Sequence, residues 1–218
     1  MKIFNYIDAA FYINLDYRTD RKKAVEERCS ELHIPVERFD AIQLRPEDVI
    51  NPYNDSNWHK KMSCTHSHFA CIELAKKRGL DNVWIMEDDV KFSSNFAEII
   101  PDIIEELKNM EWDMVFFGGE PNRKVIPYSN LLVKTNGVYG AHSYLVNSTF
   151  YDKILSTSKD GLLDVLYLNY DENNKKFFLS THLLCLQDGN FESDLWNGKI
   201  ERDELYENAY NIFVREKK

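Results

Sequence analysis

The segment VWIMEDDVKF, residues 83–92, places a short apolar run directly before three adjacent carboxylates. The first four residues are too few for a buried helix, so we predict a buried β-strand. Glu87, Asp88 and Asp89 follow at the carboxyl end of that strand. Like charges repel at this spacing unless a cation lies between them. The segment therefore predicts both a sheet and a site that attracts positive charge.

Apolar runs alternate with amphipathic runs on both sides of this segment. We predict strands at residues 10–15, 36–42, 83–89, 113–119 and 142–147, a hairpin at 128–138, and one or two late strands within 176–187. We predict helices at residues 19–32, 65–78, 95–108, 149–155 and 164–170. Strands that alternate with helices indicate an α/β fold with an open sheet, mostly parallel in its first half and flanked by helices. Ligands bind beyond the carboxyl ends of such strands, which is where the three carboxylates lie.

The composition favours one domain, and we predict a single domain over residues 1–218 because no stretch resembles a linker. The formal charge of −9 argues against binding to nucleic acid or to an anionic membrane. It also favours a metal ion over a basic patch for an anionic substrate. The N-terminal segment indicates neither a signal peptide nor an integral membrane segment. The four cysteines show no disulfide framework, so we expect a cytoplasmic location.

The carboxylate trio is the first candidate site. On an extended chain the side chains of Glu87 and Asp89 leave on the same side, so they could hold Mn²⁺ or Mg²⁺ together. Both ions take oxygen ligands and share coordination with a diphosphate. The alternative is a solvated strand end with Lys91 nearby.

The segment NLDYRTDR, residues 14–21, connects the first strand to its helix. Asn14, Asp16, Arg18 and Arg21 lie where the base and ribose of a nucleotide would lie, and arginine suits a diphosphate through paired hydrogen bonds. The alternative is a strand-to-helix turn with exposed charges.

The segment SCTHSHFAC, residues 63–71, carries two cysteines and two histidines. On the predicted helix, Cys64, His68 and Cys71 share a face, but one helix cannot supply four converging ligands, so we expect no zinc site from this helix alone. We expect Cys71 in the core. Ser67 and His68, at the expected start of the helix, could donate hydrogen bonds to a phosphate with help from the helix dipole.

The segment LQDGNFESDLW, residues 186–196, is an acidic, turn-rich loop. Gln187, Asp188, Ser193 and Asp194 could close over a ligand. The alternative is a simple turn at Asp188 and Gly189.

Taken together, these segments resemble glycosyltransferase family 25, which includes bacterial lipooligosaccharide galactosyltransferases and collagen galactosyltransferase domains. The similar stretches occur in family order and cover the chain from about Phe11 to Asp194; they are FYINLDYRTDRKK, VERFDAI, SCTHSHFACIELAKKRG, VWIMEDDVKF, WDMVFFGG and QDGNFESD. Ser63 departs from the family, which tends to have glycine before the cysteine.

The resemblance implies a GT-A-like fold that binds a nucleotide sugar. It also implies inverting transfer of a sugar, often galactose, from a UDP-sugar to a hydroxyl of a glycan, lipooligosaccharide or protein. A divalent metal would stabilise the UDP leaving group, and Asp164 matches the acidic position of the family as the general base. Asp171 and Glu172 are the next candidates, and a structural role for Asp164 stays open.

The residues that we expect at the donor site are Asn14, Asp16, Arg18, Arg21, Ser67, His68, Asp88, Gln187, Ser193 and Asp194, with the metal on Glu87 and Asp89. Two other functions stay open at this point. The chain could bind a nucleotide sugar or a protein without turnover, or it could be a metal-dependent phosphoesterase.

Overall fold

The computed structural model describes residues 2–122, 125–170 and 175–195 of the chain. The helices are α1 (Thr19–Glu31), α2 (Trp58–Arg78), α3 (Phe96–Leu107), α4 (Ser148–Leu155) and α5 (Leu163–Leu168), with short 3₁₀ helices at Lys2–Asn5 and Pro46–Asp48. The strands are β1 (Ala9–Asn14), β2 (Glu37–Asp40), β3 (Asn82–Glu87), β4 (Val90–Phe92), β5 (Met114–Phe116), β6 (Glu120–Pro121), β7 (Ile126–Pro127), β8 (Leu132–Lys134), β9 (Val138–Tyr139), β10 (Ser143–Asn147), β11 (Phe177–Ser180) and β12 (Cys185–Gln187).

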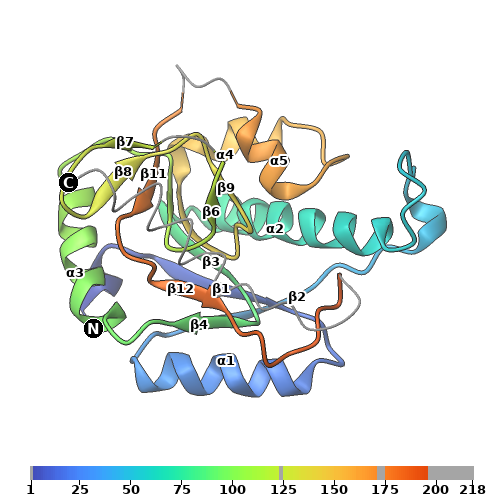
Figure 1. Ribbon diagram of the computed structural model, residues 1–218, viewed down its shortest axis with the longest axis horizontal. Helices are drawn as coiled ribbons and strands as arrows, with labels where there is room; N and C mark the ends of the chain where they lie inside the picture. The colour runs from blue at the N-terminus through green and yellow to red at the C-terminus, as the bar shows by residue number, and fades with distance from the viewer. Residues whose placement is uncertain (1, 123–124, 171–174, 196–218) are drawn as a thin grey trace.

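A mixed, mostly parallel sheet of eight strands runs through the molecule in the order β2-β1-β3-β10-β5-β11-β8-β7 (Figure 1). Strand β1 pairs in parallel with both β2 and β3, and β5 pairs in parallel with β11. Strand β10 lies between β3 and β5 and is antiparallel to both. The prediction of an α/β fold whose sheet is parallel in its first half is therefore confirmed.

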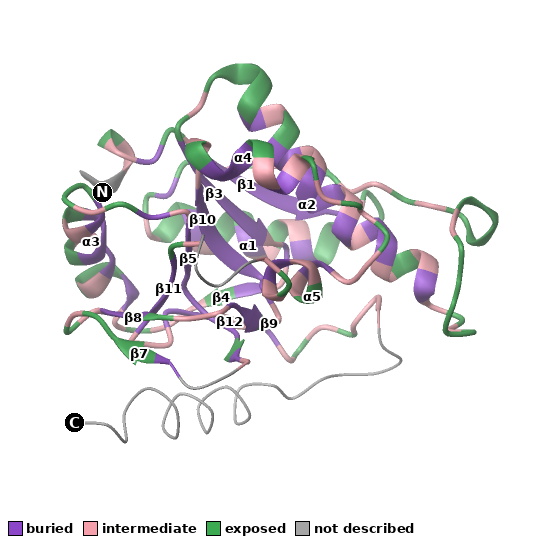
Figure 2. Cartoon of the chain, turned by 90° about the horizontal axis from the view of Figure 1, so that it is seen from above, coloured by how far each residue is buried: buried purple, intermediate pink, exposed green. Residues whose placement is uncertain are grey.

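Helices cover both faces of the sheet. Side chains alternate along β1, so Phe11 packs under α2 and α4 on one face, while Tyr12 packs with α1 and α3 on the other. Figure 2 shows that the central strands are buried between these layers. Burial on both faces explains why these strands read as continuous apolar runs in the sequence.

The strand order also creates a point at the carboxyl edge of the sheet where a ligand-binding crevice is expected. The chain leaves β1 through α1 to reach β2, and then crosses back through α2 to reach β3 on the other side of β1. Because α1 and α2 pack on opposite faces, the chain leaves the carboxyl ends of the neighbouring strands β1 and β2 toward opposite faces of the sheet (Figure 1). Ligands bind at such a divergence in open α/β sheets.

Two boundary predictions were wrong. Helix α2 begins at Trp58, about two turns before the expected start at Thr65, because the polar residues between them continue the helix instead of forming a loop. Its predicted end is confirmed, since Gly79 adopts the left-handed conformation that terminates the helix. The predicted hairpin is shorter and starts earlier, as β7 and β8, whereas β9 pairs with β6.

The described residues form one continuous architecture, and a single domain over residues 1–218 stays a prediction. Among the described residues, no helix combines the length and the apolar character that a bilayer crossing requires.

Candidate active site

A cavity of about 380 Å³ lies beyond the carboxyl ends of β1 and β3. Its wall comes from the segments after β1, β2 and β3, from α1, α2 and α5, and from the chain after β12. The three carboxylates of the trio all line it. The divergence of the two crossovers and the acidic cluster thus coincide in one cavity.

The trio does not have the extended geometry that the sequence suggested. Strand β3 ends at Glu87, and Asp88 and Asp89 form a turn before β4. The prediction that Glu87 and Asp89 leave an extended strand on the same side is therefore wrong, because the turn sets their directions. The turn nevertheless brings both side chains to the same cavity.

Asp88 is buried, and its carboxylate is held from two sides. Asn14 donates to it from the end of β1 at 2.7 Å, and Arg21 donates to it from α1 at 2.8 Å. Burial raises the pKa of Asp88, although Arg21 and Asn14 act in the opposite direction. Asp88 thus ties the first turn of α1 to the end of β3.

Asp89 carries a strongly perturbed carboxyl group. Burial and the neighbouring charge of Glu87 raise the pKa of Asp89 to about 7, against the influence of Arg21, whose Nη1 lies 3.3 Å away. The Oδ1 atom of Asp89 is buried and has no hydrogen-bond partner within the described part of the chain. An oxygen atom in this state, beside a second carboxylate, fits a ligand position for a hard divalent cation. The pair Glu87 and Asp89 therefore suits Mn²⁺ or Mg²⁺.

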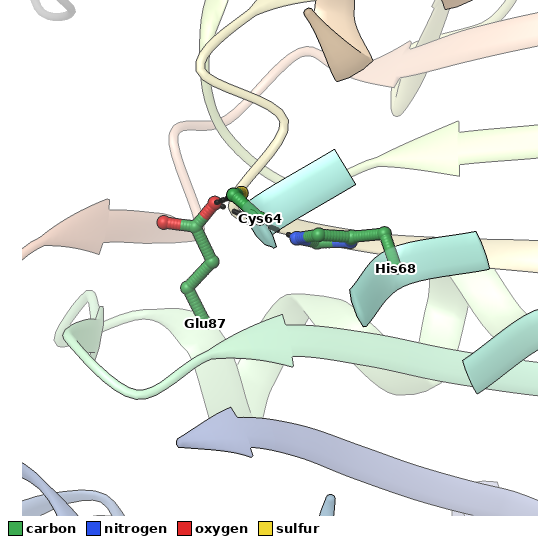
Figure 3. A group of neighbouring side chains, drawn as sticks. All are labelled: Cys64, His68 and Glu87. Atoms are coloured by element: carbon green, nitrogen blue, oxygen red, sulfur yellow. Dashed lines mark hydrogen bonds and ion pairs between the residues drawn. The ribbon is translucent and has the colours of Figure 1, made fainter. Parts of the chain in front are cut away.

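Glu87 lies between the late strand β12 and helix α2. Gln187 donates to Glu87 Oε2 at 3.2 Å, because the pairing of β12 with β4 brings it beside the end of β3. The other oxygen, Oε1, faces Cys64 and His68 of α2 (Figure 3). Desolvation of the thiol, followed by the charge of Glu87, raises the pKa of Cys64, so this thiol is not an activated nucleophile.

The segment after β12 folds over α1 and closes one side of the cavity. Asp188 accepts a hydrogen bond from Arg28, and its backbone N–H donates to the carbonyl of Asp89 at 2.7 Å. Burial raises the pKa of Asp188, but hydrogen bonds from Asn190 and Arg28 outweigh this and lower it below its ordinary value. This segment, residues 188–195 and called the late loop below, is thus fixed to both α1 and the trio.

Further contacts hold the rest of this loop. Arg21 donates to the carbonyl of Glu192 at 2.7 Å, and its guanidinium lies 5.7 Å from the centre of the Phe191 ring. Arg18 pairs with Asp194 and with Asp20. These arginines, which the sequence suggested as ligands of a diphosphate, hold protein carboxylates and carbonyls in this structure.

The cavity gathers most of the predicted site residues. The ones that line it are Arg21, Ser67, His68, Glu87, Asp88, Asp89, Asp164, Gln187, Ser193 and Asp194. Three others do not line it. Asn14 is buried beneath Asp88, Asp16 pairs with Arg38 at the surface, and Arg18 faces the outer side of the late loop. Contact of these three with a nucleotide stays a prediction.

Ser67 and His68 reach the cavity by a different route from the expected one. Both lie in the middle of α2, so the expectation that they donate to a phosphate from the start of a helix is wrong, because backbone N–H groups at that depth already bond within the helix. Ser67 accepts from the backbone N–H of Ile42 at 2.8 Å and donates to the carbonyl of Ser63 at 2.7 Å. Ser67 therefore anchors the segment after β2 to α2. Cys71 is buried in the core as predicted.

Asp164 lies in the first turn of α5 and lines the cavity from an element other than the trio. Its Oδ2 accepts from the backbone N–H of Gly140 at 3.3 Å, and its Oδ1 accepts from the N–H of Val165. Each oxygen keeps a further lone pair beyond these contacts. The runners-up, Asp171 and Glu172, lie outside the described residues.

Sequence reasoning missed two features of the site. One is the tie between Arg28 and Asp188, which joins residues 160 positions apart and leaves no local pattern. The other is the approach of Glu87 to Cys64 and His68. The i, i+4 spacing on one helix face was visible in the sequence, but its partner strand was not.

Comparison with known proteins relates this chain to a family of glycosyltransferases. The family model of glycosyltransferase family 25, described as an LPS biosynthesis protein, matches residues 7–171. A glycosyltransferase 25 family member of Drosophila melanogaster is 25% identical over 194 residues, which cover 78% of this chain and 32% of the relative. Procollagen galactosyltransferase 1-B of Xenopus laevis is 24% identical over 193 residues, which cover 76% of this chain and 31% of the relative.

Some similar proteins are named as inactive members of the family. The human protein named inactive glycosyltransferase 25 family member 3 is 29% identical over 128 residues, covering 51% of this chain and 22% of that protein. The chain spans about a third of the length of the fly and frog relatives.

The similar solved structures have low TM-scores and low sequence identity to this chain. Protein A197 from STIV aligns with a TM-score of 0.43 at 12% identity, covering 83% of this chain and 82% of that one. Mannose-1-phosphate geranyltransferase from Thermus thermophilus aligns with a TM-score of 0.43 at 12% identity, covering 79% of this chain and 73% of that one.

Proposed function

The chain belongs to glycosyltransferase family 25, and from this membership we propose that it transfers a hexose from a UDP-sugar to a hydroxyl group of an acceptor. The hexose is galactose or glucose. The acceptor is a glycan, a lipooligosaccharide or a protein. Two relatives support the galactose option through their names, which are those of procollagen galactosyltransferases.

The observation that carries the proposal is the convergence of carboxylates in one cavity at the divergence of the crossovers. Glu87 and Asp89 come from the end of β3, and Asp164 comes from α5. Metal-dependent inverting transfer from a sugar nucleotide uses two kinds of carboxylate, one to hold a cation for the diphosphate and one to take a proton from the acceptor. The cavity supplies candidates for both on separate elements.

Glu87 and Asp89 would hold the divalent cation, Mn²⁺ or Mg²⁺. The Oδ1 of Asp89 has no hydrogen-bond partner among the described residues, and the pKa of Asp89 is raised. Both observations support this assignment, since a nearby cation would stabilise the ionised carboxyl group that burial destabilises. When bound, such an ion supplies Lewis-acid stabilisation of the charge that develops on the diphosphate.

The described protein groups perform the remaining tasks. Arg21 and Asn14 fix Asp88 and thereby the turn that carries Asp89. Gln187 holds one oxygen of Glu87, which sets the orientation of that carboxylate. The late loop, tied down by Arg28 and Asp188, closes the cavity beside the trio and limits the access of water.

Asp164 is the proposed general base. Inverting transfer requires the acceptor hydroxyl on the face of the sugar opposite the diphosphate, so the base should come from a different element than the metal ligands. Asp164 meets this condition because α5 carries it to the cavity wall. Its carboxylate would receive the acceptor proton as the hydroxyl oxygen forms the new glycosidic bond and UDP leaves.

A screen of UDP-sugars with Mn²⁺ tests the proposal, with UDP release followed in the presence and absence of candidate acceptors. Acceptor-dependent release supports transfer. Binding of a UDP-sugar without release of UDP would favour a non-catalytic module, for which the inactive human relative is a precedent. Release of phosphate from simple phosphate esters would favour the phosphoesterase. The cytoplasmic location suggested by the cysteines stays a prediction.

A further inference from the structure

Three side chains with different donor atoms meet at the wall of the cavity. They are the thiol of Cys64, the imidazole of His68 and the carboxylate of Glu87, and their ligand atoms all lie within 4.8 Å of one another (Figure 3). The sulfur of Cys64 lies 3.9 Å from Glu87 Oε1, and His68 Nε2 lies 3.6 Å from the same oxygen. Helix α2 supplies the first two residues at i and i+4, and strand β3 supplies the third.

The ring of His68 is oriented for a ligand. Its Nδ1 lies 2.9 Å from the hydroxyl of Tyr144, which in turn lies 2.9 Å from the hydroxyl of Tyr167. His68 is fully buried, yet its Nε2 has no hydrogen-bond partner among the described residues, and the distance of 3.6 Å to Glu87 is too long for one. A buried ring nitrogen without a partner is costly unless something else binds there.

The contact with Tyr144 is compatible with the tautomer that a metal ligand requires. When Nδ1 carries the proton and donates it to Tyr144, the lone pair of Nε2 points toward Cys64 and Glu87. Metal-binding histidines commonly donate their second ring N–H to a neighbouring oxygen in this way, which fixes both ring orientation and tautomer. Tyr144 and Tyr167 thus supply the outer support that such a ligand needs.

We propose that Cys64, His68 and Glu87 form a three-ligand site for Zn²⁺, with the fourth coordination position open to the cavity. A sulfur, a nitrogen and an oxygen donor together suit Zn²⁺, whereas Mg²⁺ prefers oxygen ligands alone. Zinc bonds of about 2.3 Å to sulfur and about 2.0 Å to nitrogen and oxygen imply tetrahedral edges of about 3.5 Å and 3.3 Å. The observed distances of 3.9 Å and 3.6 Å need only small side-chain shifts to reach them.

Zinc binding itself needs neither the sugar donor nor the acceptor of the proposed transfer, although the two sites share Glu87. On binding, the sulfur–hydrogen bond of Cys64 is replaced by a sulfur–zinc bond, and the proton leaves to solvent. Glu87 belongs to both this site and the Mn²⁺ or Mg²⁺ site of the proposed function, whereas Cys64 belongs to the zinc site only.

Cobalt(II) titration of the purified chain tests the proposal, because Co²⁺ occupies zinc sites and absorbs in the near ultraviolet when a thiolate binds it. We expect this absorption in the wild type, its loss on addition of Zn²⁺, and its absence in Cys64→Ser. Calorimetry should show that Zn²⁺ binds at least about 10-fold more weakly to Cys64→Ser and to His68→Gln than to the wild type. Loss of an outer supporting group already weakens metal binding by about 10-fold, and loss of a ligand should cost at least as much. Cys71→Ser is the matched control, because Cys71 lies on the same helix but in the core.

Circular dichroism of each variant establishes that it is folded before titration. An absorption band that persists in Cys64→Ser, or a wild type that binds Co²⁺ without any thiolate band, overturns the proposal. Loss of the band in Cys71→Ser would also overturn it, since another thiol would then be the ligand. Glu87→Gln should weaken both the zinc site and the Mn²⁺-dependent binding of UDP, whereas Cys64→Ser should weaken the zinc site alone, so failures of the two proposals remain distinguishable.

Discussion

The Nη1 atom of Arg21 lies 2.8 Å from Oδ1 of Asp88, and both side chains are less than a tenth exposed. This contact connects the first turn of α1 to the turn after β3. It is also the point where a basic residue meets the acidic trio. The sequence placed Arg21 in a nucleotide-binding turn, but in the structure its guanidinium binds a carboxylate of the protein itself.

We predict that Arg21→Met destabilises the fold, because it leaves the buried carboxylate of Asp88 without its main cation. Breaking a buried pair on one side costs about 3–5 kcal/mol. We expect about 3 kcal/mol, the lower end of that range, because Asn14 still donates a hydrogen bond to Asp88 in the variant. Urea unfolding monitored by circular dichroism measures the change. Arg45→Met, which breaks exposed pairs with Glu47 and Asp48, is the control and should cost far less, because water screens these pairs. Equal losses in the two variants would contradict the role of Arg21.

Much of the fold follows from the sequence, because its strands are short apolar runs bounded by turns and its helices end at recognisable signals. Gly79 marked the end of α2 correctly, whereas the start of α2 was missed because the segment before Thr65 is polar and its helical character depends on packing of Trp58 and Met62. Propensity cannot show that packing.

The candidate site was likewise predicted only in part from the sequence. Glu87 and Asp89 were found because a charge cluster directly after a strand is a local pattern. The long-range contacts of the site were not found, because Arg28 reaches Asp188 and His68 reaches Glu87 only through the tertiary fold. Local spacing shows which residues share an element, but not which elements face each other.

The tie between Arg28 and Asp188 should make stability depend on pH. The pKa of Asp188 is lowered in the folded chain, so its stabilising contribution is present above the ordinary carboxyl pKa of about 3.9 and is lost as the pH falls through the folded value. Asp188→Asn should therefore reduce the free energy of unfolding by about 2 kcal/mol at pH 7 and by less at pH 3. Asp102→Asn, at a position away from the site, is the control and should change little at either pH. A loss from Asp188→Asn that is the same at both pH values would show that the carboxylate charge is not the cause.

Asp164→Asn should slow transfer without weakening nucleotide binding. The amide nearly preserves the shape of the side chain but cannot accept the acceptor proton. A positioned base contributes on the order of 10²–10⁴-fold, so kcat should fall by about that factor while the Kd for UDP stays within about 2-fold. Steady-state kinetics and calorimetry measure the two quantities. Unchanged turnover would move the assignment to Asp171 or Glu172, and lost UDP binding or unfolding would show a structural role for Asp164.

The donor should be a uridine nucleotide. Family membership motivates this expectation, and the cavity beside Arg21, Gln187 and the late loop is the place where the nucleotide would bind. Calorimetry with UDP, GDP and CMP in the presence of Mn²⁺ compares the three. Binding of UDP should be at least about 10-fold tighter, a difference of about 1.4 kcal/mol. Tighter binding of GDP or CMP would contradict the assignment.

The most direct test of the central claim is the affinity of the chain for UDP with and without a divalent metal, measured by calorimetry on the wild type and on Asp89→Asn. If Glu87 and Asp89 hold a cation against the diphosphate, UDP should bind the wild type at least about 10-fold more tightly with Mn²⁺ than with excess EDTA, and Asp89→Asn should lose most of that difference. Equal affinity of the wild type for UDP in Mn²⁺ and in EDTA, or an Asp89→Asn protein that keeps the full effect of the metal, would contradict the account.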